Sequence, residues 1–325
     1  MTDLVSNQRI AIERSPAEKR IGHLALAMAA ETLFLMALGS ATRVMNAGLA
    51  CPDWPLCYGV LIPKKQMNLQ VFLEWFHRLT ASSMGLFAIA LVVLAWWSRR
   101  ALPRWVPWMA TLALALVIFQ GILGGLTVTE LLRFDIVTAH LGTALLFFVT
   151  LLAMGVALLP YQGSGNAGNL RWVGLIAVVL VYLQSILGAL VASQWALHQC
   201  LSLASLCQMM NSHIIGVFPA TLATLLLVVL VWRTPALQLV LRRLAWAAGG
   251  LVLLQVLLGI ATFKLRLQVE PLTVCHQAIG ALLLGCLVAF TILAFRDAPQ
   301  VVSQPAIART AANDYPDHPT KEQPA

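Results

Sequence analysis

Residues 135–159 read DIVTAHLGTALLFFVTLLAMGVALL, and this stretch decides the fold. Apart from Asp135 at its start and His140, it consists mainly of apolar and small residues. Its length matches the roughly 20 residues with which a helix crosses a hydrocarbon core about 30 Å thick. Seven further runs of this kind occur at 23–42, 72–97, 105–128, 171–192, 210–232, 244–263 and 272–295. The sequence therefore predicts an all-α, polytopic membrane protein of eight transmembrane helices.

The composition excludes other classes of protein. Only 10% of the 325 residues are charged, against about 25% in a typical soluble domain. The apolar runs are too long and too uniform for the alternating strands of a membrane β-barrel. The net charge of +8 could suggest nucleic acid, but the basic residues are scattered through loops and form no basic face. We therefore expect membrane lipid as the surroundings and no nucleic acid as a partner.

The distribution of Lys and Arg predicts the orientation. Most of them lie before the first run, after each even-numbered run and in the tail, and fewer lie in the alternate loops. The positive-inside rule then places both termini in the cytoplasm. We expect residues 1–20 to be a cytoplasmic segment, 161–169 a cytoplasmic linker and 297–325, which is polar and rich in Pro, a disordered tail.

An internal repeat organises the membrane part. Every odd-numbered run ends in a Leu-Gly step, at Gly39, Gly124, Gly188 and Gly259, and in three of the four a Gln lies one helical turn earlier, at Gln120, Gln184 and Gln255. Every even-numbered run carries one histidine near its start: His77, His140, His213 and His276. His77 and His213 are 136 residues apart, as are His140 and His276. This symmetry predicts two pseudo-symmetric four-helix bundles, residues 21–160 and 170–296, with the Gly and Gln residues serving helix packing.

The four histidines are the candidate ligands. Ionisable groups inside membrane spans are functional candidates, and these four lie at one depth, roughly 6 to 9 Å below the outer helix ends at about 1.5 Å per residue. Two facing imidazoles in a bundle can supply both axial ligands of a haem iron, with cations near the outer ends as candidate propionate partners. Zinc would require a third or fourth ligand, and neither half has a clear one. Haem is therefore favoured over zinc.

One acid interrupts the repeat. Glu74 precedes His77 by three residues and so shares its helix face, while the equivalent positions hold Val137, Met210 and Thr273. This difference suggests chemistry in the first half and a structural or electron-transfer site in the second. The alternative is that Glu74 forms an ion pair with Arg78, four residues later on the same helix.

Two cysteine pairs lie in loops that the topology places on the oxidising side, where disulfides persist. Cys51 and Cys57 belong to the first such loop, and Cys200 and Cys207 to the third. A structural clamp is favoured for Cys200 and Cys207. For Cys51 and Cys57, a structural disulfide and a redox-active pair both stay open.

Over residues 21–296 the sequence resembles the haem A synthase family. The resemblance is carried by RVMNAGLACPDWPLC (43–57), EWFHRLTA (74–81), TAHLGTA (138–144), NSHIIGV (211–217) and CHQAIGA (275–281), and the two loop cysteine pairs resemble those of bacterial members. It implies an oxidoreductase of the bacterial inner membrane that converts the C8 methyl group of haem O to a formyl group. The product, haem A, would serve the assembly of terminal oxidases.

The same resemblance implies roles for individual residues. His77 and His140 would hold the substrate haem O, His213 and His276 a resident haem b, and Glu74 would be the catalytic carboxylate. Haem O synthase is the implied supplier of substrate, and the oligomeric state, including a homo-oligomer, stays open. The competing function is a bis-histidine cytochrome b that carries electrons across the membrane. It would require two histidines about 13 or 14 residues apart on one helix to span roughly 20 Å, and no run contains such a pair.

Overall fold

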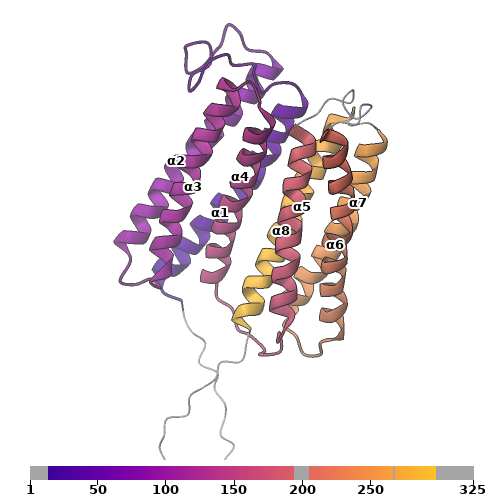
Figure 1. Ribbon diagram of the computed structural model, residues 1–325. Helices are drawn as coiled ribbons and strands as arrows, with labels where there is room; N and C mark the ends of the chain where they lie inside the picture. The colour runs from indigo at the N-terminus through magenta and orange to yellow at the C-terminus, as the bar shows by residue number, and fades with distance from the viewer. Residues whose placement is uncertain (1–13, 194–204, 266–267, 298–325) are drawn as a thin grey trace, which may run out of the picture.

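The computed structural model describes residues 14–193, 205–265 and 268–297 (Figure 1). Within these ranges the chain forms eight long helices: α1 (Pro16–Val44), α2 (Leu69–Trp97), α3 (Trp105–Thr129), α4 (Phe134–Leu158), α5 (Leu170–Ser193), α6 (Ser205–Arg233), α7 (Leu239–Lys264) and α8 (Glu270–Arg296). Each is long and apolar enough to cross a membrane. The prediction of an all-α protein with eight transmembrane helices is confirmed.

Polar capping residues extend the helices beyond the apolar runs. The Ser15 hydroxyl accepts a hydrogen bond from the Glu18 backbone N–H, and the Glu18 carboxylate accepts one from the Ser15 N–H at 2.8 Å. This reciprocal arrangement satisfies N–H groups that have no partner inside the helix. At α2, the Asn68 side chain accepts from the Val71 N–H. Pro219 lies inside α6 without ending that helix.

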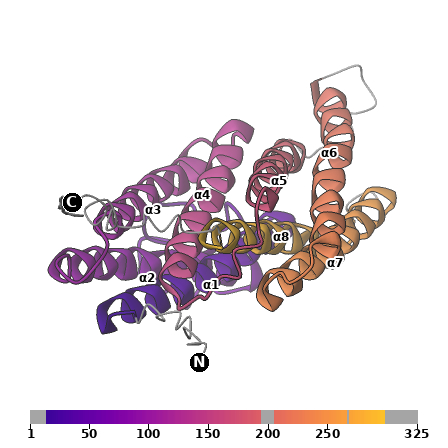
Figure 2. The same cartoon turned by 90° about the horizontal axis from the view of Figure 1, so that it is seen from below.

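The helices form two four-helix bundles that lie side by side (Figures 1 and 2). Helices α1 to α4 pack in sequence and α4 closes the ring against α1, and α5 to α8 repeat the arrangement. The bundles meet through α1 and α4 on one side and α5 and α8 on the other. In α4 and α8, 61% of the most apolar 18-residue stretch is buried inside the protein, compared with 22% of the corresponding stretch in α2 or α7. The two inner helices therefore form the centre of the molecule, and the prediction of two pseudo-symmetric bundles is confirmed.

Small residues allow the two bundles to pack closely. A β-carbon on Gly285 of α8 would lie 2.8 Å from the Phe148 ring of α4, and one on Gly142 of α4 would lie 2.8 Å from Ile186 of α5. Because lipid is as apolar as these side chains, close packing rather than burial from water holds such helices together.

A buried carboxylate joins the two bundles at one end of the molecule. Asp297, which follows α8, accepts hydrogen bonds from the backbone N–H groups of Ser164, Asn166 and Ala167 and from the Tyr161 hydroxyl, at 2.6 to 3.0 Å. Burial and this neighbouring carboxylate raise the pKa of Tyr161. The predicted linker 161–169 is thus wrapped around the end of α8, whereas residues 298–325 lie outside the described part of the chain.

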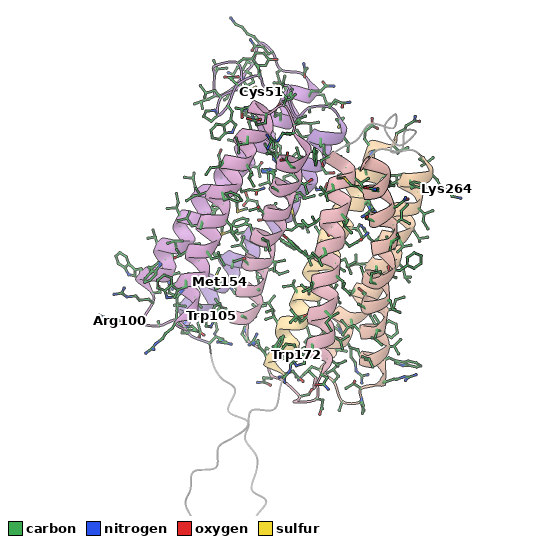
Figure 3. All side chains as sticks on the ribbon, in the orientation of Figure 1. Cys51, Arg100, Trp105, Met154, Trp172 and Lys264 are labelled. Carbon is green, nitrogen blue, oxygen red and sulfur yellow. A yellow bond between two sulfur atoms is a disulfide. The ribbon has the colours of Figure 1, made fainter. Side chains whose placement is uncertain are left out.

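Aromatic side chains mark the same end of the bundles. Trp105 and Trp172 lie towards the end opposite Cys51 and Lys264 (Figure 3), and Trp97 and Trp232 are largely exposed. Tryptophan is enriched where a membrane meets water. The ends of α1 and α8 nearest the termini lie at this end too (Figure 1), which agrees with an even number of spans.

Candidate functional site

Each of the four histidines lies against the glycine of the preceding helix. A β-carbon on that glycine would lie 2.8 Å from imidazole Cε1 for Gly39 and His77, 3.5 Å for Gly124 and His140, 2.9 Å for Gly188 and His213, and 3.1 Å for Gly259 and His276. The Leu-Gly steps, which the sequence suggested were general helix-packing positions, are therefore the walls of the histidine sites. At three of them a side chain would crowd the ring.

The glutamines one turn earlier also contact these histidines. Gln120 donates to the His140 carbonyl at 2.8 Å, and Gln184 donates to the His213 carbonyl at 2.8 Å while its amide nitrogen lies 3.0 Å from Nδ1 of that ring. The amide nitrogen of Gln255 lies 3.4 Å from Nε2 of His276. The equivalent residue beside His77 is Leu35, so that imidazole lacks an amide neighbour of this kind.

The imidazoles are brought together in two pairs, one in each bundle. His77 of α2 and His140 of α4 come from diagonally opposite helices of the first ring, and His213 of α6 and His276 of α8 from the equivalent helices of the second. In His77, His140 and His276 the Nδ1 atom is buried and has no hydrogen-bond partner among the residues that the structure describes. Polar atoms in such places usually have a partner, so these rings have capacity to spare for a ligand.

The donor set fits a haem better than zinc. Among the residues that the structure describes, no group of three or more His, Cys, Asp or Glu side chains could hold a metal ion. A closed zinc site normally has four such ligands, whereas a haem iron needs only two axial ones because the macrocycle supplies the rest. Each bundle supplies two imidazoles from apolar helices, which is the number that a haem iron needs.

Glu74 is buried beside His77 and both of its carboxylate oxygens are engaged. One accepts a hydrogen bond from the Arg78 guanidinium, and the other accepts one from the Cys51 backbone N–H at 2.7 Å. Arg78 also donates to the carbonyls of Asp53 and Leu56 at 2.6 Å. The ion pair that the sequence allowed as an alternative is therefore present, and the contact with the Cys51 backbone is one that sequence reasoning missed.

The α1–α2 loop, residues 45–68, closes over one end of the first bundle (Figure 3). Cys51 and Cys57 form a disulfide and are both buried. The Trp54 ring reaches α3, where a β-carbon on Gly125 would lie 3.3 Å from it. Gly125 directly follows the glycine that faces His140, so the disulfide loop contacts α2, which carries His77, and α3, which lies against the His140 ring.

The side chains of the second cysteine pair are outside the described part of the chain, and two of the cations near the outer helix ends, Arg43 and Arg133, have other contacts. Cys200 lies outside the described residues, as does the side chain of Cys207. Arg43 donates to the Ala192 carbonyl at 2.7 Å and so links α1 to α5. Arg133 is exposed and paired with Asp135, whose carboxylate raises the pKa of that guanidinium. Neither arginine is free to serve as a dedicated partner for a propionate without a change of contacts.

The fold and the site define a class: polytopic membrane proteins built from two four-helix repeats, each with two imidazoles that lie against glycines of the preceding helices. Comparison with known proteins narrows this class. The family model described as cytochrome oxidase assembly protein matches residues 22–288. The chain belongs to this family.

Individual relatives agree with the family. The chain is 28% identical to a protein of Shewanella oneidensis named heme A synthase, over 79% of this chain and 91% of that protein. It is 29% identical to a heme A synthase of Caulobacter vibrioides, over 85% of this chain and 96% of the relative. A protoheme IX farnesyltransferase of Halobacterium salinarum is 31% identical over 43% of this chain, but the match covers only 30% of that protein.

Proposed function

We propose that the protein is a haem A synthase, an oxidoreductase that converts the C8 methyl group of haem O to the formyl group of haem A. The observation that carries the proposal is the presence of two imidazoles in each bundle, each against a glycine, with the buried carboxylate of Glu74 one helical turn from His77 and no acid at the equivalent positions before the other three. The relatives named heme A synthase, which align along most of the chain, support the same activity.

The two bundles are proposed to have different tasks. His213 and His276, in residues 170–296, would hold a resident haem b as axial ligands, and this haem would supply electron transfer. The contact of Gln184 with the His213 ring supports a permanent site, because a second partner fixes the orientation of a ligating imidazole. His77 and His140, in residues 21–160, would hold the substrate haem. The apolar Leu35 in place of a glutamine leaves the His77 ring less restrained, which suits a haem that must enter and leave.

Glu74 is proposed as the residue that manages protons during oxidation of the methyl group, a process that releases protons as well as electrons. Its burial beside His77 and its absence from the equivalent helices support this role. Glu74 is proposed to have a second role, which is to hold the disulfide loop over the site. Its hydrogen bonds with Arg78 and with the Cys51 backbone support this role, because they connect the carboxylate to that loop. A proton transfer at Glu74 would have to exchange one of these bonds.

The proposed setting is the inner membrane of a bacterium, with both termini in the cytoplasm. The family points to assembly of a terminal oxidase as the use of the product. The likeness to a protein named protoheme IX farnesyltransferase supports a haem O synthase as the supplier of substrate. A membrane cytochrome b is less well supported, because no described helix carries two histidines at depths that would place haems near both faces.

Extraction and chromatography of the haems from purified protein tests the proposal. Protein made in a host that produces haem O should contain haem b together with haem O and haem A. His213→Ala and His276→Ala should each remove haem b, whereas His77→Ala and His140→Ala should retain haem b and stop formation of haem A. Haem b alone in the wild type, with no conversion of added haem O, would favour the cytochrome instead.

A further inference from the structure

One polar contact between the two bundles starts beside a histidine of one bundle and ends near a histidine of the other. The side-chain amide of Gln277, which directly follows His276 on α8, donates a hydrogen bond to the Met36 carbonyl of α1 at 3.3 Å. Met36 is buried and lies three residues before Gly39, the glycine that lies against the His77 ring. A single side chain therefore connects the α8 turn that carries one imidazole to the α1 turn that contacts another.

The internal repeat shows that packing alone does not require this amide. The contact of α4 with α5 is equivalent to the contact of α8 with α1, and in α4 Leu141 follows His140 as Gln277 follows His276 in α8. A leucine side chain cannot donate a hydrogen bond, so the equivalent interface packs without one at this position. A buried amide between membrane helices can simply hold them together, but the place of this one beside His276 gives it a second possible role.

A hydrogen bond at this position links movements of the two rings. His276 and Gln277 are consecutive residues, so a rotation of α8 that redirects the imidazole also moves the amide. Met36 and Gly39 are about 4.5 Å apart along the axis of α1, so a shift of the Met36 carbonyl also moves the glycine. A β-carbon on Gly39 would lie 2.8 Å from the His77 ring, the shortest of the four glycine–imidazole distances. This ring therefore has the least room to ignore a movement of α1.

Rigid helices joined by hydrogen bonds are the kind of structure that carries energetic coupling between separate sites. We propose that Gln277 is a positioning residue that couples the two haem sites, so that a haem bound in the first bundle shifts the midpoint potential of the haem b held in the second. The coupling is reciprocal, because reduction of haem b must then change the affinity for the first haem by the same factor. The inference rests on the proposed function and adds how the resident haem responds to the substrate.

The expected size follows from the loss of one hydrogen bond. Such a bond corresponds to a change in affinity of roughly three- to tenfold. For a one-electron couple, each factor of ten in affinity equals about 59 mV in midpoint potential, so the coupling should appear as a shift of about 30 to 60 mV.

The test measures the midpoint potential of haem b in the full-length protein in nanodiscs, with and without the gallium(III) form of haem O. Gallium keeps its oxidation state while haem b is titrated, so only one centre changes. Gln277→Leu removes the amide and introduces the residue type found at the equivalent position, Leu141. Tyr161→Phe is the matched control, because it removes one hydrogen bond, to Asp297 at 2.9 Å, between the ends of α4 and α8 far from the histidines.

In the wild type, the gallium porphyrin should shift the midpoint potential of haem b by about 30 to 60 mV, and its affinity should differ correspondingly between oxidised and reduced protein. Gln277→Leu should retain haem b and a wild-type thermal midpoint but lose at least half of the shift, whereas Tyr161→Phe should keep it. Gln277→Met, which has a similar length, replaces the leucine variant if that variant does not fold.

A full wild-type shift in the Gln277 variants, or an equal loss in Tyr161→Phe, would overturn the inference. So would a wild type that binds the gallium porphyrin without any shift. In each of these cases the protein would still convert haem O to haem A, and the proposed function would stand. A wild type that holds no haem b and does not convert haem O would instead contradict the proposed function.

Discussion

Alanine at the glycines that face the imidazoles should separate haem binding from folding. A β-carbon would lie 2.8 Å from the ring at Gly39, 2.9 Å at Gly188, 3.1 Å at Gly259 and 3.5 Å at Gly124. Since comfortable carbon contacts begin near 3.4 to 3.5 Å, the ring would have to move by about 0.6 Å at Gly39 and about 0.5 Å at Gly188. At Gly124 no movement is needed. Each bundle therefore contains a tighter and a looser position.

The size of the effect follows from two opposing terms. Overpacking typically costs about 1 to 3 kcal/mol, but an imidazole can turn aside, so much of that cost should fall on the ligand geometry. Alanine in a helix interior is favoured over glycine by roughly 0.5 to 1 kcal/mol. We therefore expect Gly188→Ala to leave the thermal midpoint unchanged or higher. Its affinity for haem b should fall by about 10- to 100-fold, at 1.4 kcal/mol for each factor of ten.

The assay compares the four variants with Gly121→Ala, a control at a helix position where a β-carbon would meet nothing within 4 Å. Haem b retained per protein after dilution reports on Gly188→Ala and Gly259→Ala, and binding of added haem O reports on Gly39→Ala and Gly124→Ala. Within each bundle, the variant whose β-carbon lies closer to the imidazole should lose more haem binding. Full haem b retention by Gly188→Ala, or equal losses in Gly39→Ala and Gly124→Ala, would refute the reasoning.

Three further predictions concern other parts of the molecule. If the Glu74 carboxylate transfers protons, Glu74→Gln should still bind haem but lower the rate of haem A formation per folded protein by a factor of about 10² to 10⁴. Arg78→Gln should lower this rate much less. Equal losses in the two variants would mean that Glu74 and Arg78 act by positioning the disulfide loop. Asp297→Ala should lower the thermal midpoint, because the buried N–H of Ala167 and the partly buried N–H of Ser164 lose their acceptor; an unchanged midpoint would show that these hydrogen bonds do not stabilise the fold. After mild reduction, Cys200 and Cys207 should react with an impermeant thiol reagent in right-side-out vesicles, and reaction only in inverted vesicles would reverse the topology.

The fold was predictable because the membrane imposes a simple rule. A backbone in lipid must satisfy its hydrogen bonds within each segment, so long apolar runs such as 135–159 can only be helices, and an exact repeat of histidines every 136 residues implies two similar bundles. Helix ends were less predictable, since Ser15 and Asn68 extend α1 and α2 through caps that hydropathy does not register.

The candidate sites were predictable in their residues but not in their contacts. The equivalent places of His77, His140, His213 and His276 near the starts of their apolar runs predict one depth for all four, but contact between a glycine and a ring depends on the rotation of two helices. The same applies to Glu74, because i+4 spacing predicts Arg78 as a partner while the Cys51 backbone comes from a loop whose path has no periodicity. A hydrogen bond from the Ser83 hydroxyl to the Glu31 carboxylate likewise joins residues far apart in sequence.

Three residues that break the internal repeat lie in the same two helices, which suggests how the two bundles could have acquired different tasks. Glu74, Leu35 and Glu31 each differ from their counterparts in the second bundle, and all three belong to α1 or α2. The equivalent positions in α5 and α6 hold Met210, Gln184 and Leu180. A duplicated scaffold fixes two similar pairs of imidazoles, so differences in chemistry between them must come from their surroundings. In this chain those differences lie along the contact between α1 and α2. Glu74 and the disulfide loop are at one end, Leu35 is beside the His77 ring, and Glu31 is near the middle of α1.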